Sequence, residues 1–185
     1  VADTAWLLLK QVDIMSFLGY VTLAATLKGD VLTRSSSDVP TNADSLPTYR
    51  IYGPNGLMTS GTGTTAFRDT AALTNATNAT PIVVTSTAHG LTTGTRVTIT
   101  GVVGNTAANS TFVITKISAD TFSLDGSVGN GAYVSGGTWN VSGLYLISHA
   151  ITAGNGYEAG TMYTILVSFA ISSTSGGSTF TFIAG

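Results

Sequence analysis

Two histidines are the only imidazoles in this chain of 185 residues, so acid–base or metal chemistry would have to be built around them. His89 precedes Gly90 in an expected turn, and His149 lies in an expected strand. A hydrolase triad needs an oriented base, an oxyanion hole and a nucleophile turn. This sequence contains no nucleophile turn of the GxSxG kind. Two histidines and a carboxylate can bind zinc, but the spacing of these two does not indicate such a site. We therefore predict no catalytic residue, no metal site and no bound cofactor.

Three weaker patterns have simpler structural explanations. The loop from Asp125 to Gly131 lacks the alternating carboxylates and the closing Glu of a calcium loop, so we interpret it as a flexible turn. The glycine pair Gly136-Gly137 is not followed by the Lys-Ser/Thr that a phosphate-binding loop needs. Asn-x-Ser/Thr sequons arise readily in a chain so rich in Ser and Thr, and we expect none to be glycosylated. They lie at Asn75, Asn78, Asn109 and Asn140.

The aromatic residues allow two interpretations. Core packing and cross-strand pairing account for the tyrosines and for Trp139. A tyrosine-lined face that binds sugar is the alternative.

Composition narrows the class of protein further. Only 9% of the residues are charged, against roughly 25% in ordinary soluble domains, which suits a protein packed against neighbours. The net charge is −2 and the seven basic residues are scattered, so we expect no nucleic-acid partner.

Cysteine is absent, which excludes disulfides and thiolate chemistry. The apolar stretch 14–27 is shorter than the roughly 20 residues of a membrane span, and no basic signal segment begins the chain, so we expect no membrane partner and a mature protein.

Short β-prone runs separated by turn residues predict strands along most of the chain. Alternation over 18–28 predicts one strand, and the polar, proline-containing stretch 29–47 predicts a loop. The strand 48–52 and its return over 57–62 are expected to form a hairpin around Gly53-Pro54-Asn55-Gly56. The segment 69–80, rich in Ala, Thr and Asn, is expected to be a linker. Further strands are expected at 82–85, 96–100, 111–117, 121–124, 143–151, 163–169 and 179–183.

The first residues, Val1 to Met15, fit neither a helical nor a strand period, so a short helix and an extended arm both stay open. Their apolar cluster costs about 25 cal/mol per Å² to leave in water, so we expect it to be buried against the core or a neighbour. We favour a neighbour, which makes the cluster the predicted partner-binding site: Trp6, Leu7, Leu8 and Leu9.

Residues 81–139 resemble a small β module of tailed-bacteriophage proteins. The module is named for its likeness to the first catalytic-cysteine half-domain of ubiquitin-activating enzymes. The strings that carry the resemblance are Thr87 to Leu91, Arg96 to Gly101, Asn105 to Ala108 and Asp120 to Asp125. This chain has no cysteine, so the resemblance implies a spacer or binding element and no ubiquitin chemistry.

The flanking segments resemble an immunoglobulin-like sandwich of phage structural proteins. The strings are Pro47 to Gly53, Thr59 to Gly63, Gly143 to Tyr145 and Asn155 to Thr164. Together the two resemblances imply an all-β chain in which the sandwich is interrupted by a small barrel. The expected divisions are an N-terminal arm over 1–17, a discontinuous sandwich over 18–75 and 140–185, and the inserted module over 76–139.

These resemblances imply a virion structural protein rather than an enzyme. We expect a head decoration or cement protein on the capsid surface, whose partners are the major capsid protein and further copies of itself as dimers or trimers. A tail, baseplate or fibre component that contacts host carbohydrate is the alternative within a phage. A cell-surface adhesion module is an alternative of another class.

Overall fold

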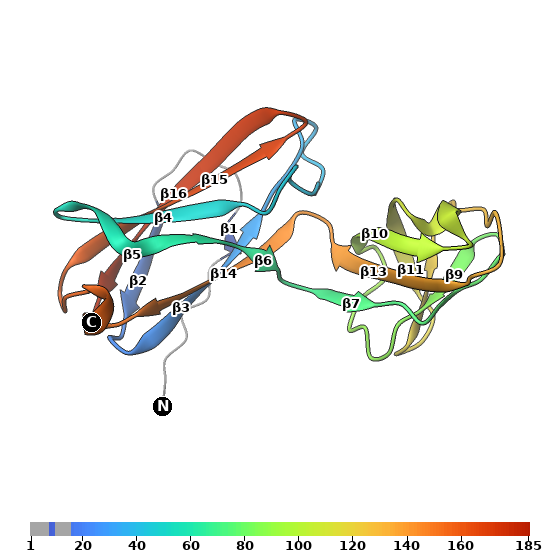
Figure 1. The fold of residues 1–185 in the computed structure, drawn as a ribbon, viewed down its shortest axis with the longest axis horizontal. Coiled ribbons are helices and arrows are strands. Elements are labelled where there is room, and N and C mark those ends of the chain that lie inside the picture. The colour runs from blue at the N-terminus through green and yellow to red at the C-terminus, as the bar shows by residue number, and fades with distance from the viewer. Residues whose placement is uncertain (1–7, 10–15) are drawn as a thin grey trace. The chain divides into compact units, whose positions relative to one another are not determined.

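The computed structural model describes residues 8–9 and 16–185. The regular structure of this part of the chain is β apart from two short 3₁₀ turns, η1 (Thr106–Ala108) and η2 (Ala153–Asn155), which confirms the all-β expectation (Figure 1). The chain divides into two compact units. Unit 1 comprises residues 1–67 and 143–185, and unit 2 comprises residues 68–142.

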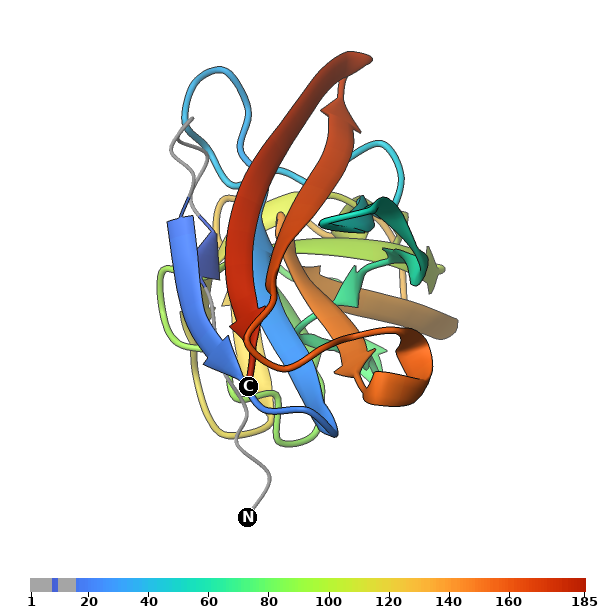
Figure 2. The same cartoon turned by 90° about the vertical axis from the view of Figure 1, so that its left-hand side faces the viewer.

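Unit 1 contains two sheets. The first has the strand order β1-β3-β14-β6 and the second has the order β2-β16-β15-β4-β5. Most neighbours are antiparallel, but β1 runs parallel to β3. Strand β2 also runs parallel to β16, as the blue and red arrows of Figure 2 show. The strands are β1 (Leu8–Leu9), β2 (Ser16–Val21), β3 (Ala25–Leu32), β4 (Thr48–Gly53), β5 (Gly56–Thr64), β6 (Ala66–Phe67), β14 (Leu144–Ile151), β15 (Met162–Ile171) and β16 (Thr174–Ala184).

Both sheets of unit 1 contribute to one hydrophobic core, because alternate residues of each strand are apolar and buried. Leu27 and Ile147 come from the first sheet, and Ile51, Ile165 and Phe182 come from the second. The hairpin expected around residues 53–56 is confirmed, with Gly53 paired to Gly56. The strands expected at 143–151, 163–169 and 179–183 are β14, β15 and β16, and the last two extend further than the apolar runs indicated.

The strand expected over residues 18–28 is wrong, because the chain turns back at Thr22–Ala24. Ala24 has φ +76°, and the N–H of Ala25 donates to the carbonyl of Thr22 at 3.0 Å. The segment therefore forms two strands that belong to different sheets. Every second residue from Val21 to Leu27 is apolar, straight through the turn, so periodicity alone does not reveal it.

Unit 2 is a curled seven-stranded sheet, with the order β7-β13-β10-β11-β12-β9-β8. The two end strands, β7 and β8, are consecutive in the chain, so the sheet curls into a half-barrel around a core that includes Ile99, Ile114, Phe122 and Trp139. Its strands are β7 (Thr70–Ala72), β8 (Asn75–Ala76), β9 (Ile82–Thr85), β10 (Arg96–Val103), β11 (Thr111–Lys116), β12 (Thr121–Leu124) and β13 (Ser135–Val141).

Ser86 joins the two ends of this sheet. Its hydroxyl donates to the carbonyl of Ala72 in β7 and accepts from the indole N–H of Trp139 in β13, both at 2.8 Å. Ser86 itself follows β9, which neighbours the other end strand, β8. The side chain is fully buried, so this pair of bonds fixes the curl from inside.

Two expectations about unit 2 are wrong. The segment 69–80 was expected to be a linker, but it forms β7 and β8 because their backbone groups pair with β13 and β9. Strand β13 was not expected, since Gly136-Gly137 indicated a turn. Both glycines have positive φ, +72° and +99°, and face Gly101 of β10, where a Cβ on Gly136 would lie 2.6 Å from the carbonyl oxygen of Gly101. Glycine permits this close crossing inside a strand pair.

Candidate docking face

The outward side of the five-stranded sheet carries exposed large apolar side chains, among them Leu57 and Met162. Tyr163, Ile165 and Val167 of β15 are at most 2% exposed and point into the core. The alternating residues of β15 therefore point away from it, and so do the residues of β4 and β16 paired with them. This outward side carries both apolar and polar residues.

Four apolar side chains are neighbours at one end of this outward side. Met162 is paired with Ile183, and Tyr52 is paired with Leu57. Tyr52 also pairs with Thr164, two residues beyond Met162, so the two pairs are diagonal neighbours. Leu57 is 50% exposed and Met162 is 55% exposed, while Tyr52 and Ile183 are half-buried. We call Tyr52, Leu57, Met162 and Ile183 the apolar outer patch.

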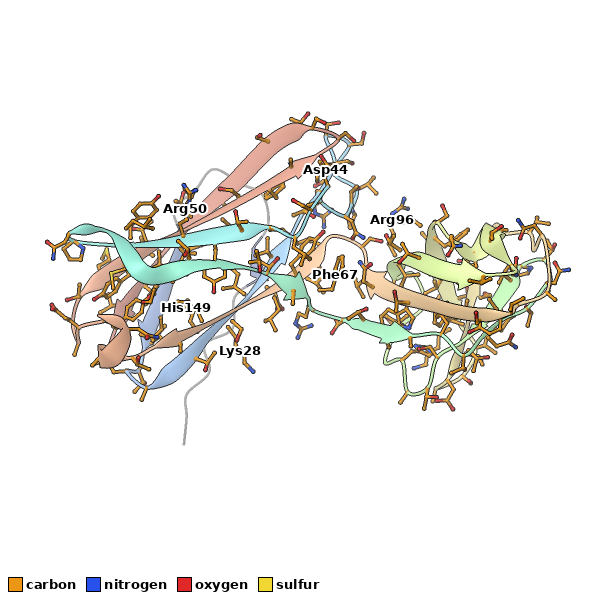
Figure 3. The ribbon with its side chains drawn as sticks, viewed as in Figure 1. Lys28, Asp44, Arg50, Phe67, Arg96 and His149 are labelled. Atoms are coloured by element: carbon orange, nitrogen blue, oxygen red, sulfur yellow. The ribbon has the colours of Figure 1, made fainter. Side chains whose placement is uncertain are left out.

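The other end of the same outward side is mostly polar, although Leu166, which pairs with Arg50, is half-buried there. Thr48 and Arg50 of β4 and Ser168 of β15 are exposed there, and Figure 3 labels Arg50 on this strand. Grouped exposed apolar residues beside a polar region are typical of interaction sites. The apolar outer patch was not predicted from the sequence. The sequence shows the alternation within β15 but not the strand pairing that brings Met162, Ile183 and Tyr52 together.

The predicted partner-binding residues have a different place. Leu8 and Leu9 form β1, whose backbone pairs in parallel with Asp30 and Val31 of β3. Trp6 and Leu7 lie outside the described residues. The expected arm over 1–17 is thus described only at β1 and at the beginning of β2.

The two histidines lie in different units, so the structure does not bring them together. His89 follows the turn at residues 87–88 and is 6% exposed. Its Nδ1 accepts from the N–H of Leu91 at 3.0 Å, which places the proton on Nε2, 3.2 Å from the carbonyl oxygen of Ser118. Both ring nitrogens are occupied by backbone groups, so His89 holds the loop before β10 in place.

His149 of β14, labelled in Figure 3, is 8% exposed and lies in hydrogen-bonding distance of two tyrosines. The hydroxyl of Tyr157 lies 2.8 Å from Nε2, and the hydroxyl of Tyr49 lies 3.3 Å from Nδ1. Burial lowers the pKa of His149 and raises the pKa of Tyr49 and of Tyr157. All three groups are therefore neutral near pH 7, and the network satisfies polar atoms inside an apolar core.

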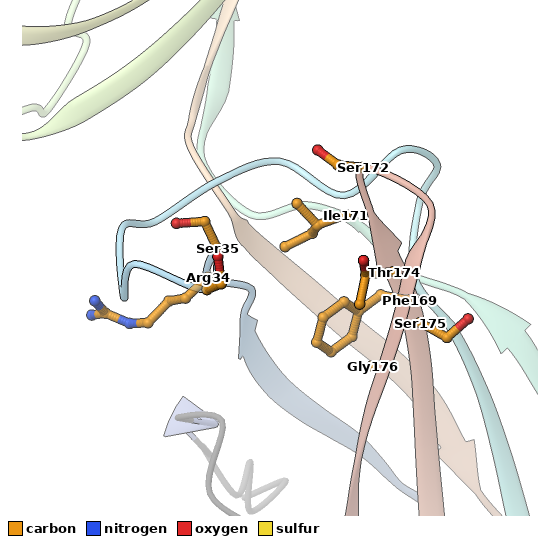
Figure 4. Close-up of a pocket in the computed structure, with 9 residues that line it drawn as sticks. Arg34, Ser35, Phe169, Ile171, Ser172, Thr174, Ser175 and Gly176 are labelled. Atoms are coloured by element: carbon orange, nitrogen blue, oxygen red, sulfur yellow. The ribbon is translucent and has the colours of Figure 1, made fainter.

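A pocket of about 270 Å³ lies between the segment after β3 and the inner side of the β15–β16 hairpin (Figure 4). Arg34 and Ser35 line one side, and Phe169, Ile171 and Thr174 line the other. Among the described residues that line it there is no carboxylate, imidazole or thiol, so these residues offer no acid–base pair or nucleophile–base pair.

Asp44 fixes the hairpin turn beside this pocket. Its two carboxylate oxygens accept from the N–H groups of Ser172 and Ser173, each at 2.8 Å. Both serines have positive φ, and the carboxylate compensates for this strained turn.

A second pocket, of about 290 Å³, lies in unit 2 and is lined by His89, Trp139 and the exposed ion pair of Arg68 and Asp69. Both ring nitrogens of His89 are hydrogen-bonded to backbone groups, as described above. Within residues 8–9 and 16–185, no three His, Cys, Asp or Glu side chains gather as metal ligands would. The same residues include no helix long and apolar enough to cross a membrane.

No protein-family model and no curated protein matches this chain.

Proposed function

We propose that unit 1 is an immunoglobulin-like sandwich into which the half-barrel of unit 2 is inserted. Such sandwiches place strands A, B, E and D in one sheet and strands C, F and G in the other. The order β3-β14-β6 corresponds to B-E-D, and β16-β15-β4-β5 corresponds to G-F-C-C′, while β1 and β2 each add a parallel strand to one edge. The insertion then falls between strands D and E.

A tyrosine contact supports the same assignment. Immunoglobulin-like sandwiches often carry a tyrosine near the start of strand F whose hydroxyl bonds to backbone a few residues upstream. Tyr163 occupies this position in β15, and its hydroxyl accepts from the N–H of Glu158 at 2.9 Å. The single core shared by both sheets of unit 1 is also the arrangement that a sandwich requires.

For function, we propose a structural protein of a tailed-phage virion that decorates the head and stabilises it. The observation that carries this proposal is the apolar outer patch, which exposes Leu57 and Met162 on a regular sheet face where a partner could cover them. The resemblance of residues 81–139 to a phage module and the charge content of only 9% support it.

The mechanism is thermodynamic. Covering the patch removes apolar surface from water, so attachment adds binding free energy to the assembled shell and opposes its disruption. The proposed partner is the major capsid protein, with further copies of the chain around a symmetry axis. Trp6, Leu7, Leu8 and Leu9 remain a second proposed contact, separate from the patch, because Leu8 and Leu9 pair with β3 in the other sheet. The proposed location is the capsid surface, and the tail is the alternative.

Binding to capsids that lack the protein tests this proposal. The purified chain is mixed with such capsids and co-sedimented, and occupancy is measured against concentration. Leu57→Glu and Met162→Glu should each weaken binding roughly tenfold or more, because burying one such side chain contributes roughly 1.5–3 kcal/mol.

Thr62→Glu is the matched control, since Thr62 is exposed on β5 but pairs with Arg50 at the polar end of the sheet. It should leave capsid binding nearly unchanged. Equal loss in all three variants would argue against docking through the patch. Binding to tails but not to capsids would contradict the decoration role and favour the tail alternative.

A further inference from the structure

Three Asn-Gly pairs occur in the chain: Asn55-Gly56, Asn130-Gly131 and Asn155-Gly156. Asn-Gly is the dipeptide most prone to spontaneous deamidation, because glycine has no side chain to hinder attack by its backbone nitrogen. The reaction requires the asparagine side chain to turn toward that nitrogen. A structure that holds the side chain elsewhere therefore suppresses it.

Two of the three asparagines are held in this way. The side chain of Asn130 accepts from the N–H of Ala107 at 3.0 Å and donates to the hydroxyl of Thr106 at 2.9 Å. The side chain of Asn155 donates to the carbonyl of Ala150 at 3.1 Å.

The backbone nitrogen of Gly156 is also engaged. It donates to the carbonyl of Ala153 at 2.9 Å and is fixed in η2 as a left-handed cap. Both partners of the attack are thus constrained at Asn155-Gly156.

Asn55 is different. It lies with Pro54 in the two-residue turn between β4 and β5, where Asn55 and Gly56 are both exposed. Within the described residues, no side-chain hydrogen bond holds Asn55. Gly56 begins β5 opposite Gly53 with φ +104°, and a Cβ built on it would meet nothing within 4 Å, so no neighbouring atom crowds the turn at this residue. We propose that Asn55 is a deamidation site that adds a negative charge beside the apolar outer patch.

The chemistry needs only water. The backbone nitrogen of Gly56 forms a bond to Cγ of Asn55, and the side-chain nitrogen leaves as ammonia, which closes a five-membered imide. Water then opens either carbonyl of the imide and gives aspartate or isoaspartate. Both products carry one carboxylate where the chain had a neutral amide, and no oxidant or reductant takes part.

The position of the turn gives the modification a consequence. Tyr52 and Leu57 flank the turn and are paired members of the apolar outer patch. A carboxylate between them must lose water when a partner covers the patch, which costs binding free energy. This part of the inference rests on the proposed docking role. Virions would then carry an attachment that weakens as the protein ages.

Peptide mapping by mass spectrometry tests the modification itself. The folded full-length chain is incubated at mildly alkaline pH, and a second sample is incubated in denaturant. In denaturant all three asparagines should deamidate at similar rates. In the folded chain Asn55 should deamidate severalfold faster than Asn130 and Asn155. Equal rates at the three sites in the folded chain, or protection of Asn55 on folding, would overturn the proposal.

Capsid co-sedimentation tests the consequence. Asn55→Asp should bind severalfold more weakly than the unaged protein, whereas Asn55→Gln, which keeps the amide but forms the imide far more slowly, should bind normally and resist ageing. Unchanged binding of Asn55→Asp would refute the consequence. If no form of the chain binds capsids, the docking role fails, while the mapping result still decides whether Asn55 deamidates.

Discussion

At the scale of single residues, buried imidazoles have clear structural roles in both units. His149 lies between Tyr49 and Tyr157 inside an apolar core, and no carboxylate takes part in the network that the structure shows. A protonated imidazole there would have no anionic partner. The ring is therefore stable only in its neutral form, which makes unit 1 sensitive to acid.

The prediction is that unit 1 loses stability as pH falls below about 6.5. The unfolded chain takes up a proton at the ordinary histidine pKa of 6.5, while burial lowers the pKa of folded His149. The contribution of neutral His149 to the free energy of unfolding is therefore fully present above pH 6.5. It declines as the pH falls below 6.5 and stops declining below the folded-state pKa. Hydrogen exchange of peptides from β14 and β15 at pH 7.5 and 5.5 measures this loss of protection.

His149→Gln is the control, because glutamine is polar but does not titrate. It should be less stable than the original chain at pH 7.5 and should show little further change at pH 5.5. A pH dependence that persists in this variant would show that another group is responsible.

The sequence was informative about the two histidines at this scale. The neighbouring glycine predicted His89 in a turn, and alternation predicted His149 in a strand; the structure places His149 in β14 and His89 just after the turn at residues 87–88. Their hydrogen-bond partners were not predictable, because Tyr49 lies 100 residues from His149 and Ser118 lies 29 residues from His89. Contacts over such separations depend on the topology, which local patterns do not contain.

At the scale of elements, the predicted strands were reliable where turns contain glycine or proline. The hairpin at residues 53–56 and the strands 82–85 and 121–124 are examples. The turn at Thr22–Ala24 was missed because it uses residues with no turn preference, and β13 was missed because glycine occurs inside a strand. The apolar outer patch was missed for a related reason, since pairing between strands cannot be read from one strand.

Ala24 offers a test of that turn. Its φ of +76° is a conformation that costs a residue with a Cβ roughly 1–2 kcal/mol but costs glycine little. Ala24→Gly should therefore stabilise unit 1 by up to about 1 kcal/mol, after the greater chain entropy of glycine in the unfolded state is subtracted. Thermal unfolding followed by circular dichroism measures the change.

Substituting the neighbouring residue by glycine should change the stability in the opposite direction. Ala25 is buried within β3, so Ala25→Gly should destabilise the unit by roughly 0.5–1 kcal/mol. Two variants that shift the unfolding midpoint in the same direction would contradict the assigned turn.

At the scale of the whole molecule, the two crossings of the chain between the units lie close together within each unit. In unit 1, Phe67 at the end of β6 pairs with Tyr145 in β14. In unit 2, Thr70 pairs with Asn140, and the N–H of Val141 donates to the carbonyl of Asp69 at 3.0 Å. Adjacent ends are what an inserted unit needs, because the host fold then spans only a short gap.

Excision of unit 2 should therefore leave unit 1 folded. Deleting residues 68–142 and joining Phe67 to Gly143 through a short Gly/Ser linker closes a gap between paired strands, which lie roughly 5 Å apart. The shortened chain should give a dispersed amide spectrum and unfold cooperatively. A collapsed spectrum, or one recovered only when unit 2 is present, would contradict the independence of unit 1.

We propose the chain as a structural part of a phage head, attached through the apolar outer patch. Its copy number in purified virions, measured by quantitative mass spectrometry against the major capsid protein, tests this claim most directly. A decoration protein should be present in a fixed and large ratio to the capsid protein. A few copies per virion, or none, would contradict the account.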